Sequence, residues 1–100
     1  MAKGYAIVTE VIRDTALYRS YVEKAVRTIQ HAGGRIIVAD DNPMIIEGKW
    51  HGPRTVVVEF DSADAARGWY DSGEYQAIVG LRRAAAESNA VVVSGFEARR

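Results

Sequence analysis

The chain has 100 residues, 48% of them apolar and 26% charged, which is ordinary for a single globular domain spanning residues 1–100. The 13 basic and 13 acidic side chains cancel, so net charge gives no reason to expect nucleic acid or an anionic membrane as a partner. Cysteine is absent, which excludes disulfides, thiol catalysis and thiolate metal sites and suits a cytoplasmic protein.

The apolar runs are short throughout the chain. None approaches the roughly 20 residues that a membrane-spanning helix needs. The first predicted strand also begins within a few residues of Met1, which leaves no room for a signal peptide. We therefore expect a protein without a membrane partner, located in the cytoplasm.

The first part of the chain predicts a strand, a helix and a second strand. Tyr5 to Ile12 is apolar on both faces of an extended segment, as in a strand that is covered on two sides. Asp14 is a suitable N-cap for a helix from Thr15 to about Ala32, where apolar residues recur every three or four positions. Gly33-Gly34 ends this helix, and Arg35 to Ala39 forms the next strand.

The middle of the chain predicts one short and one central strand. Two turns, at residues 40–43 and 51–53, flank a short extended piece from Met44 to Trp50. The apolar segment from Arg54 to Phe60 is the strand that we expect in the middle of the sheet.

The last part predicts a broken helix and a final strand. Ser62 caps a helix that reaches Trp69-Tyr70 and breaks at Ser72-Gly73. A second helical piece is predicted from Glu74 to about Ser88, with Asn89 as its breaker, and Ala90 to Phe96 is the last strand.

The order of these elements is βαββαβ, the ferredoxin-like arrangement of the α+β class. Right-handed connections place both helical regions on one face of a four-stranded antiparallel sheet. The strands are apolar on both faces, so the face without helices would expose a large apolar patch in a lone subunit. We therefore predict a homodimer in which two sheets meet through their open faces.

Several sequence runs resemble one family. These are Glu47-Gly48-Lys49-Trp50, the strand Val56 to Phe60 with Asp61-Ser62, and Trp69-Tyr70-Asp71-Ser72 followed by Glu74-Tyr75-Gln76. They resemble the DUF1330 family over nearly the whole chain. The resemblance implies a dimeric α/β barrel, a superfamily that includes small cofactor-independent monooxygenases, haem-degrading enzymes and proteins like chlorite dismutase. It implies no reaction.

The aromatic residues around the helix break are the main candidates for a site. Core packing explains them most simply. The functional interpretation is an aromatic pocket between sheet and helices with a few polar groups, as in the cofactor-free oxygenases of that superfamily. The candidate ligand-binding residues are Tyr18, Arg54, Glu59, Trp69, Tyr70, Tyr75 and Arg82.

Glu59 lies among valines in the predicted central strand. If it is buried, it needs a partner, and Arg54 or Arg82 could provide one. Such a pair would either contact a ligand or hold the register of a dimer interface, and the sequence leaves both open. A shift of one residue in strand register would move Glu59 to the other face of the sheet.

The sequence gives little support for a metal site, a phosphate-binding loop or a nucleic-acid-binding surface. His31 and His51 lack the spacing of a metal site or haem ligand, so we expect no metal and no cofactor. Gly33-Gly34 precedes a strand and does not open a helix, which argues against a phosphate-binding loop. Arg82-Arg83 is a pair without an interleaved aromatic patch, so nucleic-acid binding is not expected.

Two functions therefore remain open. One is a small homodimer that binds or transforms a small organic molecule without a cofactor, such as an aromatic or carbonyl compound. The other is a non-catalytic structural or accessory dimer whose aromatic residues only fill the core. The sequence does not decide whether the protein is an enzyme.

Overall fold

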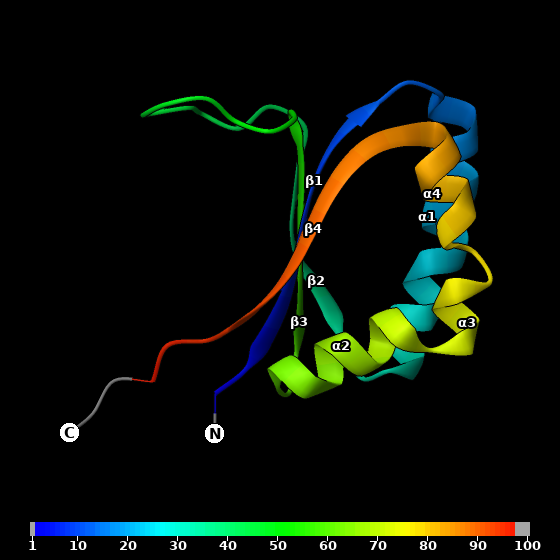
Figure 1. Cartoon of the computed structure of the whole chain (residues 1–100), viewed down its shortest axis with the longest axis vertical. Helices are drawn as coiled ribbons and strands as arrows, with labels where there is room; N and C mark the ends of the chain where they lie inside the picture. The colour runs from blue at the N-terminus through cyan, green and yellow to red at the C-terminus, as the bar shows by residue number, and fades with distance from the viewer. Residues whose placement is uncertain (1, 98–100) are drawn as a thin grey trace.

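A computed structural model describes residues 2–97. These residues form four strands and four helices, and the first and last of them lie at the same end of the sheet (Figure 1). The elements in order are β1 (Gly4–Ile12), α1 (Thr15–His31), β2 (Arg35–Asp40), β3 (Arg54–Phe60), α2 (Ala63–Asp71), α3 (Gly73–Gln76), α4 (Val79–Ala85) and β4 (Ala86–Ser94).

The sheet is antiparallel throughout, in the order β2-β3-β1-β4. All helices lie on one face, so the predicted βαββαβ architecture is confirmed (Figure 1). The prediction that Arg54 to Phe60 lies inside the sheet is also confirmed, since β3 pairs with both β2 and β1.

Local sequence signals determine both ends of α1. The Asp14 carboxylate accepts a hydrogen bond of 3.0 Å from the Leu17 amide, as expected of an N-cap. At the other end Gly33 has a φ of 76°, and the amides of Gly33 and Gly34 donate to the carbonyls of Gln30 and Ile29. This pattern is a Schellman motif, which requires a residue that tolerates left-handed backbone.

The helical region before β4 is shorter than predicted. Instead of one helix from Glu74 to about Ser88, α3 and α4 are two short helices, and β4 begins at Ala86 rather than at Ala90. The cause is pairing across the sheet, because Ala86 to Asn89 lie opposite Ile12 to Thr9 of β1. Asn89 is therefore part of a strand and does not end a helix.

The connection between β2 and β3 is a projecting arm, which we define as Asp41–Pro53. The prediction of a continuous extended piece from Met44 to Trp50 is wrong, because the chain bends at Glu47 and Gly48, where Gly48 has a φ of 73°, and this segment forms no strand within the described residues. The arm leaves the sheet on the side opposite to the helices (Figure 1).

The core fills the space between the sheet and the helices. Phe60 of β3 packs on Trp69 of α2 with 5.5 Å between ring centroids. The Trp69 indole N–H also donates to Thr28 Oγ1 of α1 at 2.9 Å, so one buried side chain ties the sheet to two helices.

The other face of the sheet, which we call the open face, carries no helix in the described part of the chain. It presents apolar side chains that stay partly or largely exposed, including Val38, Val91 and Val93. An uncovered apolar surface of this kind marks an interaction site in soluble proteins.

Two glycines allow a matched test of this packing. A Cβ on Gly4 would lie 2.1 Å from the Ser62 carbonyl oxygen, whereas a Cβ on Gly68 would meet no atom within 4 Å. We expect Gly4→Ala to lower the free energy of unfolding by about 1–3 kcal/mol through overpacking. Gly68→Ala, inside α2, should raise it by roughly 0.5–1 kcal/mol. Urea denaturation measures both, and equal effects of the two substitutions would contradict this packing.

Candidate functional site

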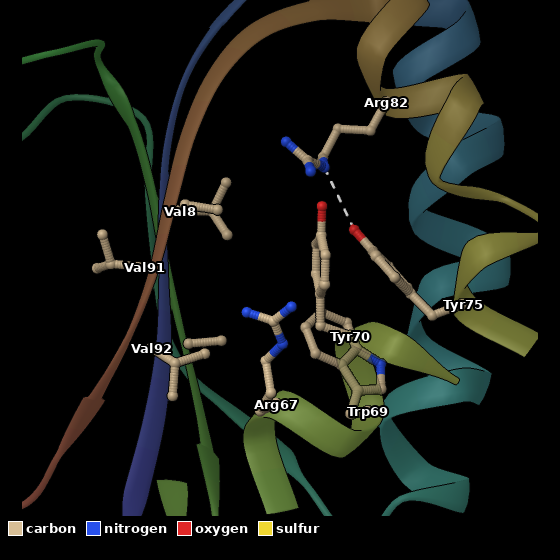
Figure 2. A pocket seen from close by; sticks show the side chains of 10 residues that line it. Val8, Arg67, Trp69, Tyr70, Tyr75, Arg82, Val91 and Val92 are labelled. Atoms are coloured by element: carbon tan, nitrogen blue, oxygen red, sulfur yellow. Dashed lines mark hydrogen bonds between the residues drawn. The ribbon is translucent and has the colours of Figure 1, made fainter. Parts of the chain in front are cut away.

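A cavity of about 490 Å³ lies between the sheet and the helices α2, α3 and α4. Figure 2 shows the sheet side chains on one side of it and the aromatic and arginine side chains on the other. The residues that line it are Ala6, Val8, Arg67, Trp69, Tyr70, Tyr75, Arg82, Ala90, Val91 and Val92.

The break at Ser72 brings the three aromatic residues together. The Ser72 hydroxyl donates to the Trp69 carbonyl at 2.7 Å and accepts from the Tyr75 amide at 3.2 Å, so one side chain ends α2 and begins α3. As a result the Tyr75 ring lies 4.3 Å from the Trp69 ring and 5.6 Å from the Tyr70 ring, centroid to centroid.

Arg82 is the most buried charged group at this cavity, with 6% of its surface exposed. Its Nε donates to the Tyr75 hydroxyl at 3.2 Å, and that hydroxyl lies 2.7 Å from the hydroxyl of Tyr21. The two terminal nitrogens of the guanidinium have no hydrogen-bond partner among residues 2–97. They point into the space in front of Val8 (Figure 2).

The charge on Arg82 is maintained despite its burial. Burial works against the charged form, but the nearby Tyr75, Tyr21 and Glu10 oxygens outweigh it and raise the pKa of the Arg82 guanidinium. A charged guanidinium with unpartnered N–H groups attracts a carboxylate, which can accept two parallel hydrogen bonds, or an enolate, whose single oxygen accepts from one or both N–H groups.

The lining of this cavity contains two arginines and no acidic side chain. Arg67 is exposed and pairs with Asp71 at 2.8 Å, so its charge is largely balanced. Arg83 lies beside the cavity and donates to the Tyr70 hydroxyl at 3.2 Å. The local balance therefore favours an anionic group.

A second cavity, of about 50 Å³, lies deeper between α1 and the sheet, and Glu10 is its notable residue. Glu10 is 1% exposed and accepts hydrogen bonds from Tyr18 and, at 2.9 Å, from Ser88. Arg82 lines both cavities. Glu10 was not predicted as a site residue, although it shares a strand face with the apolar Ala6 and Val8, an alternation that is visible in the sequence.

The structure brings four of the seven predicted residues to the large cavity: Trp69, Tyr70, Tyr75 and Arg82. Tyr18 and Arg54 line the small one, where the Arg54 guanidinium lies 5.9 Å from the Tyr18 ring centroid. Arg67 was not predicted, and its surface position in a charged helix gave no signal for it.

Glu59 does not belong to this group. Val58 and Phe60 face the helices, so strand alternation turns Glu59 to the open face. The expected pairing with Arg54 or Arg82 is wrong. Glu59 instead accepts from Arg35 at 3.0 Å and from the Tyr5 hydroxyl at 3.2 Å, and Arg54 pairs with Asp41 at 2.9 Å.

The described residues offer no cluster of three or more side chains suited to hold a metal ion. His31 lies 2.8 Å from Glu74 on the surface, and His51 packs beside Trp50 in the arm. Within residues 2–97, no helix combines the length and the apolar character needed to cross a membrane.

Comparisons with known proteins place the chain in a family. The family model described as "Domain of unknown function (DUF1330)" matches residues 3–96. No curated protein matches the chain.

Among solved structures, the RPA0582 protein of unknown function from Rhodopseudomonas palustris has a TM-score of 0.78 and 14% identity, covering 97% of this chain and 85% of that one. SnoaB, a cofactor-independent oxygenase from Streptomyces nogalater, has a TM-score of 0.65 and 13% sequence identity. The match covers 100% of this chain and 96% of the SnoaB chain. A dimeric ferredoxin-like protein of unknown function from Thermobifida fusca has a TM-score of 0.53 and 16% sequence identity. The match covers 93% of this chain and 91% of the Thermobifida fusca chain. These similarities confirm the predicted ferredoxin-like fold, and at such identities they show the fold alone.

Tyr18 provides a test of the buried hydrogen bond to Glu10. Burial and then this bond raise the pKa of Tyr18 from 10.0 to about 12. Because the neutral phenol is favoured in the folded state, this stabilisation is complete below pH 10 and is lost as pH rises through 12. We expect the free energy of unfolding to fall less steeply over this range in Tyr18→Phe than in the unmodified protein. Denaturation series at several pH values measure both slopes, and equal slopes would contradict the assignment.

Proposed function

This chain belongs to the DUF1330 family, which carries no assigned reaction, and we propose that it binds a small organic anion in the large cavity and transforms it without a cofactor. The observation that carries the proposal is Arg82, a charged guanidinium with free N–H groups at the wall of a largely apolar cavity. A ligand with a planar apolar body and a carboxylate, phenolate or enolate group matches this lining.

The size and the lining of the cavity define the ligand further. A volume of about 490 Å³ falls within the range of roughly 300–1,000 Å³ of small-molecule sites. The partly exposed ring of Tyr70 offers a stacking surface on the helix side, next to the buried rings of Trp69 and Tyr75. Ala6 and Val8 line the cavity on the sheet side and make it apolar. These features favour a flat aromatic or conjugated carbonyl compound.

The chemistry that these residues can supply is stabilisation of negative charge. The terminal nitrogens of Arg82 and the hydroxyl of Tyr70 can donate to an oxygen atom on which charge develops, as in the formation of an enolate or phenolate. The fold shared with SnoaB, a cofactor-independent oxygenase, supports a reaction that uses the substrate's own carbanion or phenolate character.

A second candidate function is a non-catalytic accessory dimer. The burial of Trp69 and Tyr75, which are 5% and 1% exposed, favours it because such side chains contribute mainly to core packing. The two functions differ in one measurable respect: only the first requires that a ligand bind the folded state with help from Arg82.

Ligand binding is tested by thermal shift with matched pairs of compounds, for example benzoate against benzamide and phenylpyruvate against its amide. We expect the anionic member of a pair to raise the melting temperature in a dose-dependent way, because it binds the folded state selectively. Arg82→Lys keeps the charge but loses the planar fork, and should weaken binding by about tenfold or more. Arg27→Lys, at an exposed position of α1, is the matched control.

Two outcomes would decide against the ligand proposal. Neutral members that shift the melting temperature as much as the anions would remove the role assigned to Arg82. Equal affinities of the Arg82→Lys and Arg27→Lys variants would place any binding elsewhere and favour the accessory dimer.

We also propose that the protein is a homodimer that forms through the open face. The apolar side chains of Val38, Val91 and Val93 remain exposed there, and the similar Thermobifida fusca protein is described as dimeric. With a net charge of zero, two copies repel each other little. The localisation that we propose is the cytoplasm, in line with the absence of cysteine.

Val38→Lys tests the dimer. Val38 lies on edge strand β2 and is 40% exposed, so a lysine fits the isolated subunit but would bury a charge in the interface. We expect sedimentation equilibrium at micromolar concentration to give a dimer for the unmodified protein and a monomer for the variant. Gln30→Lys, on the exposed side of α1, should remain dimeric. A monomeric unmodified protein would refute the dimer.

A further inference from the structure

The tip of the arm exposes apolar side chains that contact little of their own chain. Met44 and Ile46 are 88% and 89% exposed, and Ile45 between them is 56% exposed. Figure 1 shows the arm projecting well beyond the open face of the sheet, on the side opposite to the helices. Side chains of this kind, presented together at the end of a projection, mark a contact with another surface.

The base of the arm is held in place from both ends. Asp41 pairs with Arg54 at 2.9 Å, and the Trp50 indole donates to Thr55 Oγ1 at 3.0 Å. Gly52 is packed so tightly that a Cβ there would lie 2.6 Å from the Glu10 backbone. The direction of the arm is therefore determined by the sheet itself.

The large cavity reaches the free edge of the sheet. Val92 of β4 shares the helix-facing side with Ala6, whereas Val91 faces the opposite side, and both line the cavity. In Figure 2 Val91 points away from the helices. Because β4 is an edge strand, the cavity extends around this edge to the open face, where a second copy would border it.

We infer that, in the homodimer, the arm of one copy lies along β4 of its partner and closes the partner's cavity with its apolar tip, Met44–Ile46. The inference rests on the proposed function, since the cavity it completes is the proposed ligand site. Each site would then contain residues from both copies, and a lone subunit would have an incomplete site.

The dimensions agree with this arrangement. The 13 residues from Asp41 to Pro53 run out and back, so about six extended residues give a reach of roughly 20 Å. Two sheets that pack face to face are separated by about 10 Å. Counted from Asp41, Ile46 is about five extended residues, or roughly 17 Å, along the arm, so it passes the plane of the partner's sheet and reaches the layer between that sheet and its helices, where the cavity lies. Met44, about three residues or roughly 10 Å along the arm, reaches the plane of that sheet.

Topology and charge point to the same contact. The arm follows β2 at one edge of the sheet, and the cavity opens at β4, the other edge. A two-fold axis between facing sheets that sets the β2 edge of one copy beside the β4 edge of the other places each arm at a cavity. Glu47, next to the tip, is exposed, and the lining that it would approach carries Arg67 and Arg82 without an acidic residue.

Cross-linking tests the inference without any ligand, because the chain has no cysteine of its own. One protein carries Met44→Cys at the arm tip, and a second, larger tagged protein carries Val92→Cys at the cavity. The two are co-expressed, purified as a mixed dimer and treated with a short bismaleimide reagent. We expect a covalent heterodimer on a denaturing gel. Met44→Cys paired with Arg27→Cys, on the exposed side of α1, is the control and should give little product.

The outcomes separate this inference from the proposed function. A cross-linked yield no greater than that of the control, in a sample that sediments as a dimer, would overturn the arm contact. Efficient cross-linking supports the contact even if the ligand screen gives no hit, because the reaction does not depend on ligand binding. Replacing both Met44 and Ile46 by serine in the unmodified dimer should also weaken benzoate binding severalfold, and unchanged affinity would overturn the role of the arm in the site.

Discussion

Two sets of buried polar contacts hold together the elements that surround the cavities, and the arrangement of the rest depends on them. Glu10 of β1 accepts from Tyr18 of α1 and Ser88 of β4, while Arg82 of α4 donates to Tyr75 of α3. A buried polar group without a partner costs free energy, so these bonds tolerate little change in register or helix position. Ser88 lies directly opposite Glu10 in the pairing of β4 with β1, so its bond to Glu10 supports the early start of β4.

The second set of contacts also positions one charged group at the large cavity. The Nε of Arg82 is used to hold Tyr75, which leaves its terminal nitrogens directed at an apolar space. A guanidinium positioned by its own hydrogen bonds is pre-organised to receive an anion, because little reorganisation is needed on binding. The fold alone would not indicate this, because similar folds serve many functions and the similar solved structures share only 13–16% identity with the chain.

The candidate site could be predicted from sequence only in part. The aromatic residues around Ser72 were identifiable because a capping residue within a helical pattern brings its neighbours together. Glu10 and Arg67 were not predicted. Glu59 was predicted as a candidate ligand-binding residue, but it lies on the open face of the sheet, away from the cavity. A charged residue in an apolar strand indicates burial or an interface, but the face on which it lies depends on register, which is determined by pairing with distant strands.

Local signals in the sequence determined the helix α1 with its Asp14 cap and its Gly33 end, the central strand β3, and the order of elements that defines the fold. These features depend on residues within a few positions of one another. The tertiary structure alone decided that residues 86–89 join a strand, that Glu59 turns to the open face, and that the segment after β2 projects as an arm. Each of these depends on contacts between residues far apart in the chain, and for that reason no local pattern could reveal them.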